Sequence, residues 1–97
     1  MSGGSLPTIT GTYIGTGALI EIKTPGFRPK RVELINMTTA SYNVHTDKMD
    51  AGTGLSIAAA AAVVGSQFVT LTDDGFNVGT NAAINSLGEQ VQFVAVG

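Results

Sequence analysis

The chain has no cysteine and little charge. Without cysteine among its 97 residues, disulfides, thiolate catalysis and cysteine-ligated zinc are excluded. A domain of this size buries only about 60–70% of its unfolded surface, so additional stabilisation has to come from packing or oligomerisation. Charged residues make up 12% of the chain, against about 25% in a typical soluble domain. An exterior so poor in charge indicates that part of it is buried against other chains.

The small net charge also narrows the choice of partners. A net charge of −2 provides no attraction to nucleic acid or to an anionic membrane. The one local group of basic residues, Arg28, Lys30 and Arg31, is either a solvated turn and strand start or a docking patch for an acidic partner. The longest apolar run, 57–64, is too short to span a bilayer, and nothing after Met1 resembles a signal peptide. We therefore expect a protein used without secretion, with neither nucleic acid nor membrane as partner.

Short alternating stretches between turn residues predict an all-β fold. Seven or eight strands at a spacing of roughly 8–12 residues favour a single small β-sandwich or jelly-roll-like domain, over residues 9–97 after a flexible arm at 1–8. The organising hairpin is Asp73 to Asn81, where an Asp-Asp-Gly turn leads into the alternating Phe76 and Val78. The predicted core residues are Ile20, Ile22, Val32, Leu34, Tyr42, Val44, Phe76, Val78, Val91 and Phe93.

Three predictions concern how the strands are used. The strands at 9–14 and 18–23 are joined by a glycine-rich segment and are expected to form a hairpin. The strand at 31–37 has apolar residues on both faces and is expected to be central. The next strand has the clearest pattern with one buried face, because Tyr42 and Val44 alternate with polar neighbours.

The alanine-rich stretch at 57–64 has two interpretations. Alanine is the best helix former, Ser56 can cap and Gly65 can end a short helix. Eight residues are marginal for a helix, and every other segment is β, so an extended, closely packed stretch is the alternative. Small side chains let backbones approach closely, which indicates either a subunit contact or a cover for the open end of the sandwich. The candidate contact residues are Ala59, Ala60 and Ala61.

The residues give no pattern of a catalytic or metal site. His45, the single histidine, lies near Asp47 and Asp50, but no second histidine or cysteine is close in sequence. The turn at Asp73 and Asp74 has too few ligands for calcium. Nothing marks a nucleophile elbow around any serine. We therefore expect no enzyme, no cofactor and no metal.

Several motifs resemble a recurrent β-domain of tailed-phage virion proteins. They are the glycine-rich Gly11 to Gly17, Gly26-Phe27-Arg28-Pro29-Lys30 entering a strand, and Thr46-Asp47-Lys48-Met49. The best match is Asp74-Gly75-Phe76-Asn77-Val78-Gly79, followed by a closing strand to Ala95. The pair Gly-Phe-x-Pro and Gly-Phe-x-Val-Gly is more specific together than either motif alone.

This resemblance covers residues 9–96 and implies a function in a virion. Its first implication is a head decoration (cement) protein that binds the major capsid protein and braces neighbouring capsomers as a homotrimer. Its alternative is a tail or tail-fibre module that binds a host-surface receptor or glycan. For that role Tyr13 or Tyr42 could stack on a sugar ring, although both also suit core or rim packing.

Overall fold

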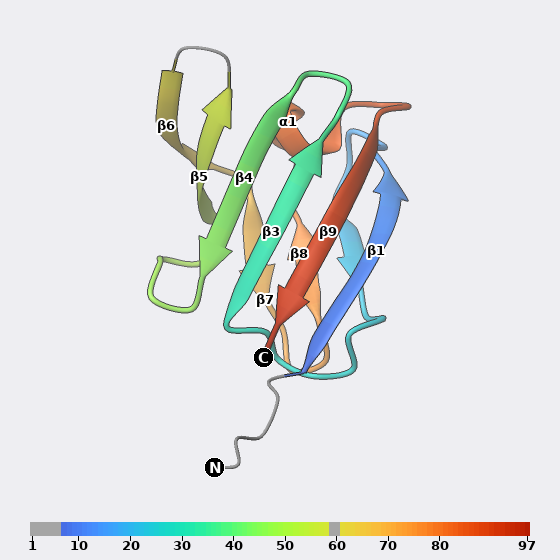
Figure 1. Ribbon diagram of the computed structural model, residues 1–97, viewed down its shortest axis with the longest axis vertical. Helices are drawn as coiled ribbons and strands as arrows, with labels where there is room; N and C mark the ends of the chain where they lie inside the picture. Colours follow the sequence, from blue (N-terminus) through green and yellow to red (C-terminus); the bar gives the residue numbers. More distant parts are fainter. Residues whose placement is uncertain (1–6, 59–60) are drawn as a thin grey trace.

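The fold is a sandwich of two antiparallel sheets, seen in a computed structural model that describes residues 7–58 and 61–97 (Figure 1). The large sheet has six strands in the order β1-β9-β3-β4-β5-β6, and the small sheet has three in the order β2-β8-β7. The prediction of a small all-β sandwich is confirmed, with nine strands in the described residues where seven or eight were expected.

The elements are divided between the two sheets and one short helix. The large sheet contains β1 (Thr8–Ile14), β3 (Arg31–Asn36), β4 (Ser41–Thr46), β5 (Thr53–Ala58), β6 (Ala61–Ser66) and β9 (Gln90–Val96). The small sheet contains β2 (Ile20–Ile22), β7 (Val69–Leu71) and β8 (Phe76–Val78), and a short helix, α1 (Ala82–Asn85), follows β8. β1 begins within the predicted arm, of which residues 1–6 lie outside the described residues.

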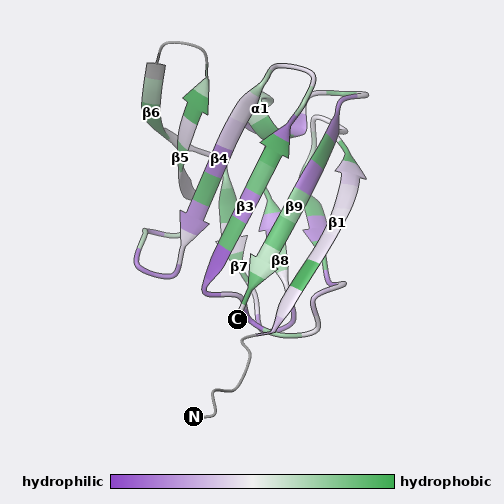
Figure 2. Cartoon of the chain, in the orientation of Figure 1, coloured by the Kyte–Doolittle hydropathy of each residue, from purple (hydrophilic) through white to green (hydrophobic). Residues whose placement is uncertain are grey.

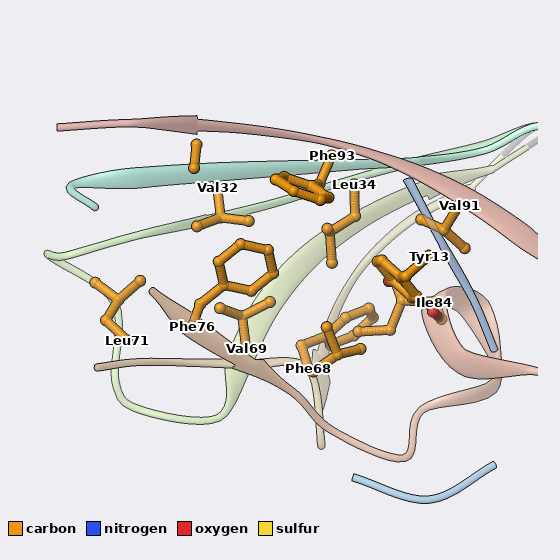
Figure 3. Packing of buried hydrophobic residues seen from close by; sticks show 12 residues of the cluster. Tyr13, Val32, Leu34, Phe68, Val69, Leu71, Phe76, Ile84, Val91 and Phe93 are labelled. Atoms are coloured by element: carbon orange, nitrogen blue, oxygen red, sulfur yellow. Dashed lines mark hydrogen bonds between the residues drawn. The ribbon is translucent and has the colours of Figure 1, made fainter. Parts of the chain in front are cut away.

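The core lies between the two sheets (Figure 3). Phe76 of β8 and Phe93 of β9 meet edge to face across the layers, with ring centroids 5.4 Å apart and planes at 73°. This geometry contributes about 0.5–1.5 kcal/mol beyond the buried area. Ile20 and Ile22 are half-buried and pack against the cluster. The predicted core residues that are buried are Val32, Leu34, Phe76, Val78, Val91 and Phe93.

The prediction for β4 placed the wrong face in the core. Tyr42 is exposed and Val44 half-buried, whereas the buried side chains are the polar Ser41, Asn43 and His45. The neighbouring strand decides this, because the buried Leu34 of β3 is paired with Asn43 and paired residues share a face. Alternation shows that a strand has two faces, but the register with its neighbour determines which one is buried.

The expected first hairpin does not form. β1 pairs with β9 in the large sheet, and β2 pairs with β8 in the small sheet. The glycine-rich connection is held by the distant segment 85–89: Gly15 N–H donates to the Glu89 carbonyl at 2.8 Å, and Gly17 N–H donates to that of Asn85 at 3.0 Å. A Cβ on Gly15 would collide with the Ser86 carbonyl oxygen, so glycine permits this close approach.

The helix interpretation of the alanine-rich stretch is wrong, and the extended one is confirmed where the structure describes it. β5 and β6 form an antiparallel hairpin in continuous register, from Thr53 opposite Ser66 to Ala58 opposite Ala61. β5 is also paired with β4, so pairing in the sheet outweighs the helix propensity of alanine. Ala59 and Ala60 lie outside the described residues.

The predictions of a central strand at 31–37 and of the organising hairpin are confirmed. β3 is central, since it is paired with β4 on one side and β9 on the other. β7 and β8 form the organising hairpin, closed by the Thr72 N–H, which donates to the Gly75 carbonyl at 2.9 Å. Phe76 and Val78 from this hairpin are completely buried.

Candidate functional site

Two of the three basic residues, Arg28 and Arg31, have ion-pair partners of their own. Arg28 lies 3.7 Å from Asp73 in the turn after β7, and Arg31 lies 3.0 Å from Glu33 along β3. Lys30 is exposed. Because each arginine has a carboxylate nearby, the positive electrostatic potential that the three basic residues present to an acidic partner is small. The docking role of these residues stays a prediction.

His45 connects two strands. It is 2% exposed, and its Nδ1 lies 2.7 Å from the Thr53 carbonyl at the start of β5. A carbonyl only accepts, so Nδ1 carries the proton and donates. Burial lowers the pKa of His45, while the Thr53 carbonyl and the charge of Asp47 oppose the shift. The ring is therefore neutral near pH 7 and acts as a structural donor.

A shallow depression lies next to His45, and its acidic and imidazole groups do not gather into a metal-binding cluster. The depression has a volume of about 300 Å³ and is lined by Arg28, His45, Asp47, Met49, Ala51, Thr70 and Leu71. No three His, Cys, Asp or Glu side chains come together to hold a metal ion anywhere in residues 7–58 and 61–97.

The buried side-chain amide of Asn85 holds two chain segments together. The Asn85 Oδ1 accepts from the N–H groups of Thr16 at 2.7 Å and Gly17 at 3.2 Å. Its Nδ2 donates to the carbonyls of Ala18 at 2.6 Å and Gly79 at 2.8 Å. One side chain thus uses both ends of its amide to fix the β1–β2 connection against the chain that leaves β8.

The two tyrosines have different roles. Tyr13 is 8% exposed and its hydroxyl donates to the Ile84 carbonyl at 2.7 Å, so burial raises its pKa and it belongs to the core. Tyr42 is 36% exposed and its hydroxyl donates to Glu33 Oε1 at 2.8 Å. Burial, then the contact with Glu33, raises the pKa of Tyr42. Between the two tyrosines, Tyr42 is the one that a ligand could reach.

The face of the large sheet that points away from the small sheet, called the outer face below, is broad and nearly uncharged. Only the paired Arg31 and Glu33 bring charge to it within the described strands. Figure 2 marks hydrophobic residues of both faces in β3, β4 and β5, and those on the outer face are Ile35, Val44, Leu55 and Ile57. By the pairing registers, the polar and charged residues of the outer face are Thr8, Thr10, Thr12, Arg31, Glu33, Thr46, Thr53, Ser66, Gln90 and Gln92, and the apolar and aromatic ones are Ile14, Ile35, Tyr42, Val44, Leu55, Ile57, Ala62, Val64, Val94 and Val96.

The outer face has a shallow apolar depression near its β4–β5 side. Its volume is about 420 Å³, and its lining includes Ile35, Met37, Tyr42 and Ile57. Met37 is 68% exposed and Ile57 is 43% exposed. Apolar side chains this exposed on one continuous surface are typical of interaction sites.

The β5–β6 hairpin extends this surface to the edge of the sheet (Figure 1). At this edge β6 has an exposed side chain on each face. Val63 is 57% exposed and Val64 is 78% exposed. The sequence analysis identified this stretch as a possible contact, but through its alanines. The signal it missed is that no charged residue occurs between Asp50 and Asp73.

No family model, curated protein or solved structure matches the chain. The function therefore has to be argued from surfaces and composition. No helix in the described residues has the length and apolar character needed to cross a bilayer.

Proposed function

We propose that the protein is a structural component of a tailed-phage virion: a head decoration protein that binds the major capsid protein and stabilises the capsid. The single observation that supports this best is the outer face, which is broad, almost free of charge and apolar mainly over β4, β5 and β6. The sequence resemblance provides the virion setting. In this proposal the protein acts by binding and performs no catalysis.

The size of the outer face suits a docking surface. Six strands about 4.8 Å apart, each with six residues at about 3.3 Å, give a face of about 570 Å². A specific interface buries about 800 Å² of accessible surface per partner, more than this flat area, so the whole face would be used. With Arg31 and Glu33 already paired, the contact would be mainly apolar and only weakly sensitive to salt.

The experiment adds purified protein to assembled, undecorated heads and measures their disruption temperature. Binding to the intact particle stabilises it by about 2.7 kcal/mol per site at a hundredfold excess over Kd, so the temperature should rise. Gln92→Lys places a charge on an exposed position of the outer face and should abolish most of the rise. Leu87→Lys, at an 81% exposed position outside this face, should behave as wild type.

Two outcomes would contradict the proposal. A protein without affinity for heads is not a decoration protein, and a Gln92→Lys variant that binds as well as Leu87→Lys excludes the outer face.

Replacing Arg28, Lys30 and Arg31 by alanine tests the basic residues separately. If they dock on an acidic capsid surface, this variant binds more weakly and loses what salt dependence the wild type has.

The second candidate is a tail module that binds a host-surface glycan, and Tyr42 supports it. An exposed ring beside a carboxylate and an apolar depression is a plausible sugar site. Electron microscopy of particles separates the two candidates, because a decoration protein covers the head in many copies and a tail module is present in few. The homotrimer that the resemblance implies stays a prediction, and it is an alternative to the two-fold pairing proposed in the next subsection.

A further inference from the structure

The edge strand β6 is paired on one side only, with β5, in the described residues of a single chain. It ends the large sheet, and in the described residues no strand lies on its outer side. Its backbone donors and acceptors on that side can be satisfied by an extended partner. Val63 and Val64 also lack cover on the two faces, with 57% and 78% of their surfaces exposed.

β6 has none of the usual features that prevent edge pairing. Natural edge strands are protected by charges, prolines, bulges or short length. β6 has six residues, no charge and no proline, and its register with β5 is continuous. At the other end of the sheet, β1 also has no charge and no proline, but Thr8, Thr10 and Thr12 make its outer face more polar, although Ile14 is exposed, and the core covers Tyr13.

We propose that β6 pairs antiparallel with β6 of a second copy of this chain, so that two large sheets join into one. A two-fold axis perpendicular to the sheet, beside the centre of β6, places β6 of the second copy antiparallel to β6 of the first. The outer faces of the two large sheets then lie on the same side. Val63 or Val64 then lies opposite its own counterpart, and apolar side chains meet on both faces. This inference does not rest on the proposed function.

Charge favours a second copy as the partner. No charged side chain occurs between Asp50 and Asp73, so two identical edges meet without like charges opposite each other. The charges on the outer face, Arg31 and Glu33, are paired with each other on β3, three strands away from β6. Pairing of β6 with a second copy would therefore bring no unpaired charged side chain into the contact.

The size of the contact suits a concentration-dependent dimer. With Val63 or Val64 opposite its own counterpart, five residues of each β6 are paired and exchange up to about six hydrogen bonds. Interfaces have about one hydrogen bond per 100–200 Å², so this ladder corresponds to roughly 600–1,200 Å² of buried surface. That range reaches the lower limit of specific interfaces.

The first experiment measures mass by sedimentation velocity over a range of concentrations. Wild type should dimerise as concentration rises, and Val64→Lys should raise the dissociation constant by at least about tenfold, because two lysines then approach each other across the axis. The matched control is Leu87→Lys, which adds the same charge at a position of similar exposure and should dimerise as wild type does. Far-UV circular dichroism checks that all three are folded.

The second experiment uses the absence of cysteine. Val63→Cys and Val64→Cys each introduce the sole thiol of the chain. Residues directly opposite in an antiparallel pair have Cβ atoms about 4.5–5.5 Å apart, close to disulfide geometry. One of the two variants should therefore form disulfide-linked dimers much faster under mild oxidation than Leu87→Cys.

Each contrary result overturns the inference. A wild type that stays monomeric at all concentrations excludes the pairing, and a dimer that tolerates Val64→Lys has its interface elsewhere. A trimer, or pairing of β6 with β1 of the next copy in a ring or filament, excludes the two-fold axis. Because the protein is measured alone in solution, these results are independent of whether it binds heads.

Discussion

Two apolar hairpins of this molecule have opposite surroundings. The β7–β8 hairpin forms part of the small sheet and buries Phe76 and Val78 completely, whereas the β5–β6 hairpin leaves Val63 and Val64 largely exposed. In the large sheet β5 and β6 lie at the end, and the small sheet has only three strands to cover it. Apolar composition alone therefore does not make a core; a second layer has to lie opposite. The uncovered hairpin is where partners are expected.

Truncating one residue in each hairpin should give the largest contrast. Phe76→Ala removes a completely buried ring that packs on Phe93 and should lower the free energy of unfolding by about 3–5 kcal/mol. Val64→Ala, at a position that is 78% exposed, should change it by less than about 0.5 kcal/mol. Urea denaturation of dilute protein measures both. Similar losses for the two variants would show that the β5–β6 hairpin is part of the core.

The base of the β5–β6 hairpin should be more sensitive than its exposed strand. Phe68 is 2% exposed and packs against Gly54 and Gly65, so a Cβ on Gly65 would collide with the ring. We expect Gly65→Ala to cost about 1–3 kcal/mol through overpacking, again measured by urea denaturation. An unchanged stability would mean that Phe68 can rotate away and that the hairpin is attached more loosely than its packing indicates.

The smallest expected effect is a dependence on pH. The folded state lowers the pKa of His45 through burial, so the unfolded chain binds a proton more readily. Stability from the neutral ring is fully present above the unfolded value of about 6.5 and is lost as pH falls through the lowered folded pKa. The free energy of unfolding should therefore decrease from pH 7.5 to pH 5.

A His45→Asn variant provides the control for this titration. It should lose the part of the pH dependence that belongs to the imidazole, although it is less stable at pH 7.5. Between Asp50 and Asp73 there is no titratable side chain, so the exposed hairpin contributes nothing to the effect. Equal slopes for wild type and variant would contradict the assignment to His45.

Much of the fold could be predicted from local pattern. Turn chemistry at Asp73, Asp74 and Gly75 located the β7–β8 hairpin, and alternation at Val91 and Phe93 located both the last strand and its buried face. These predictions succeeded because turn preference and alternation are properties of neighbouring residues. The contact predicted at 59–61 was argued from small alanine side chains and not from the absence of charge around them, and it stays a prediction.

The sequence by itself determined that this chain is all-β, that β3 is central and that little charge reaches the surface. Only the tertiary structure decided that β1 pairs with β9, that His45 and Asn43 point inward, and that the alanine-rich stretch is extended. Each of these depends on which strand lies alongside, and backbone hydrogen bonds between distant residues outweigh local preferences of a few tenths of a kcal/mol per residue. Pairing between strands also left β6 at the edge, which local pattern does not encode.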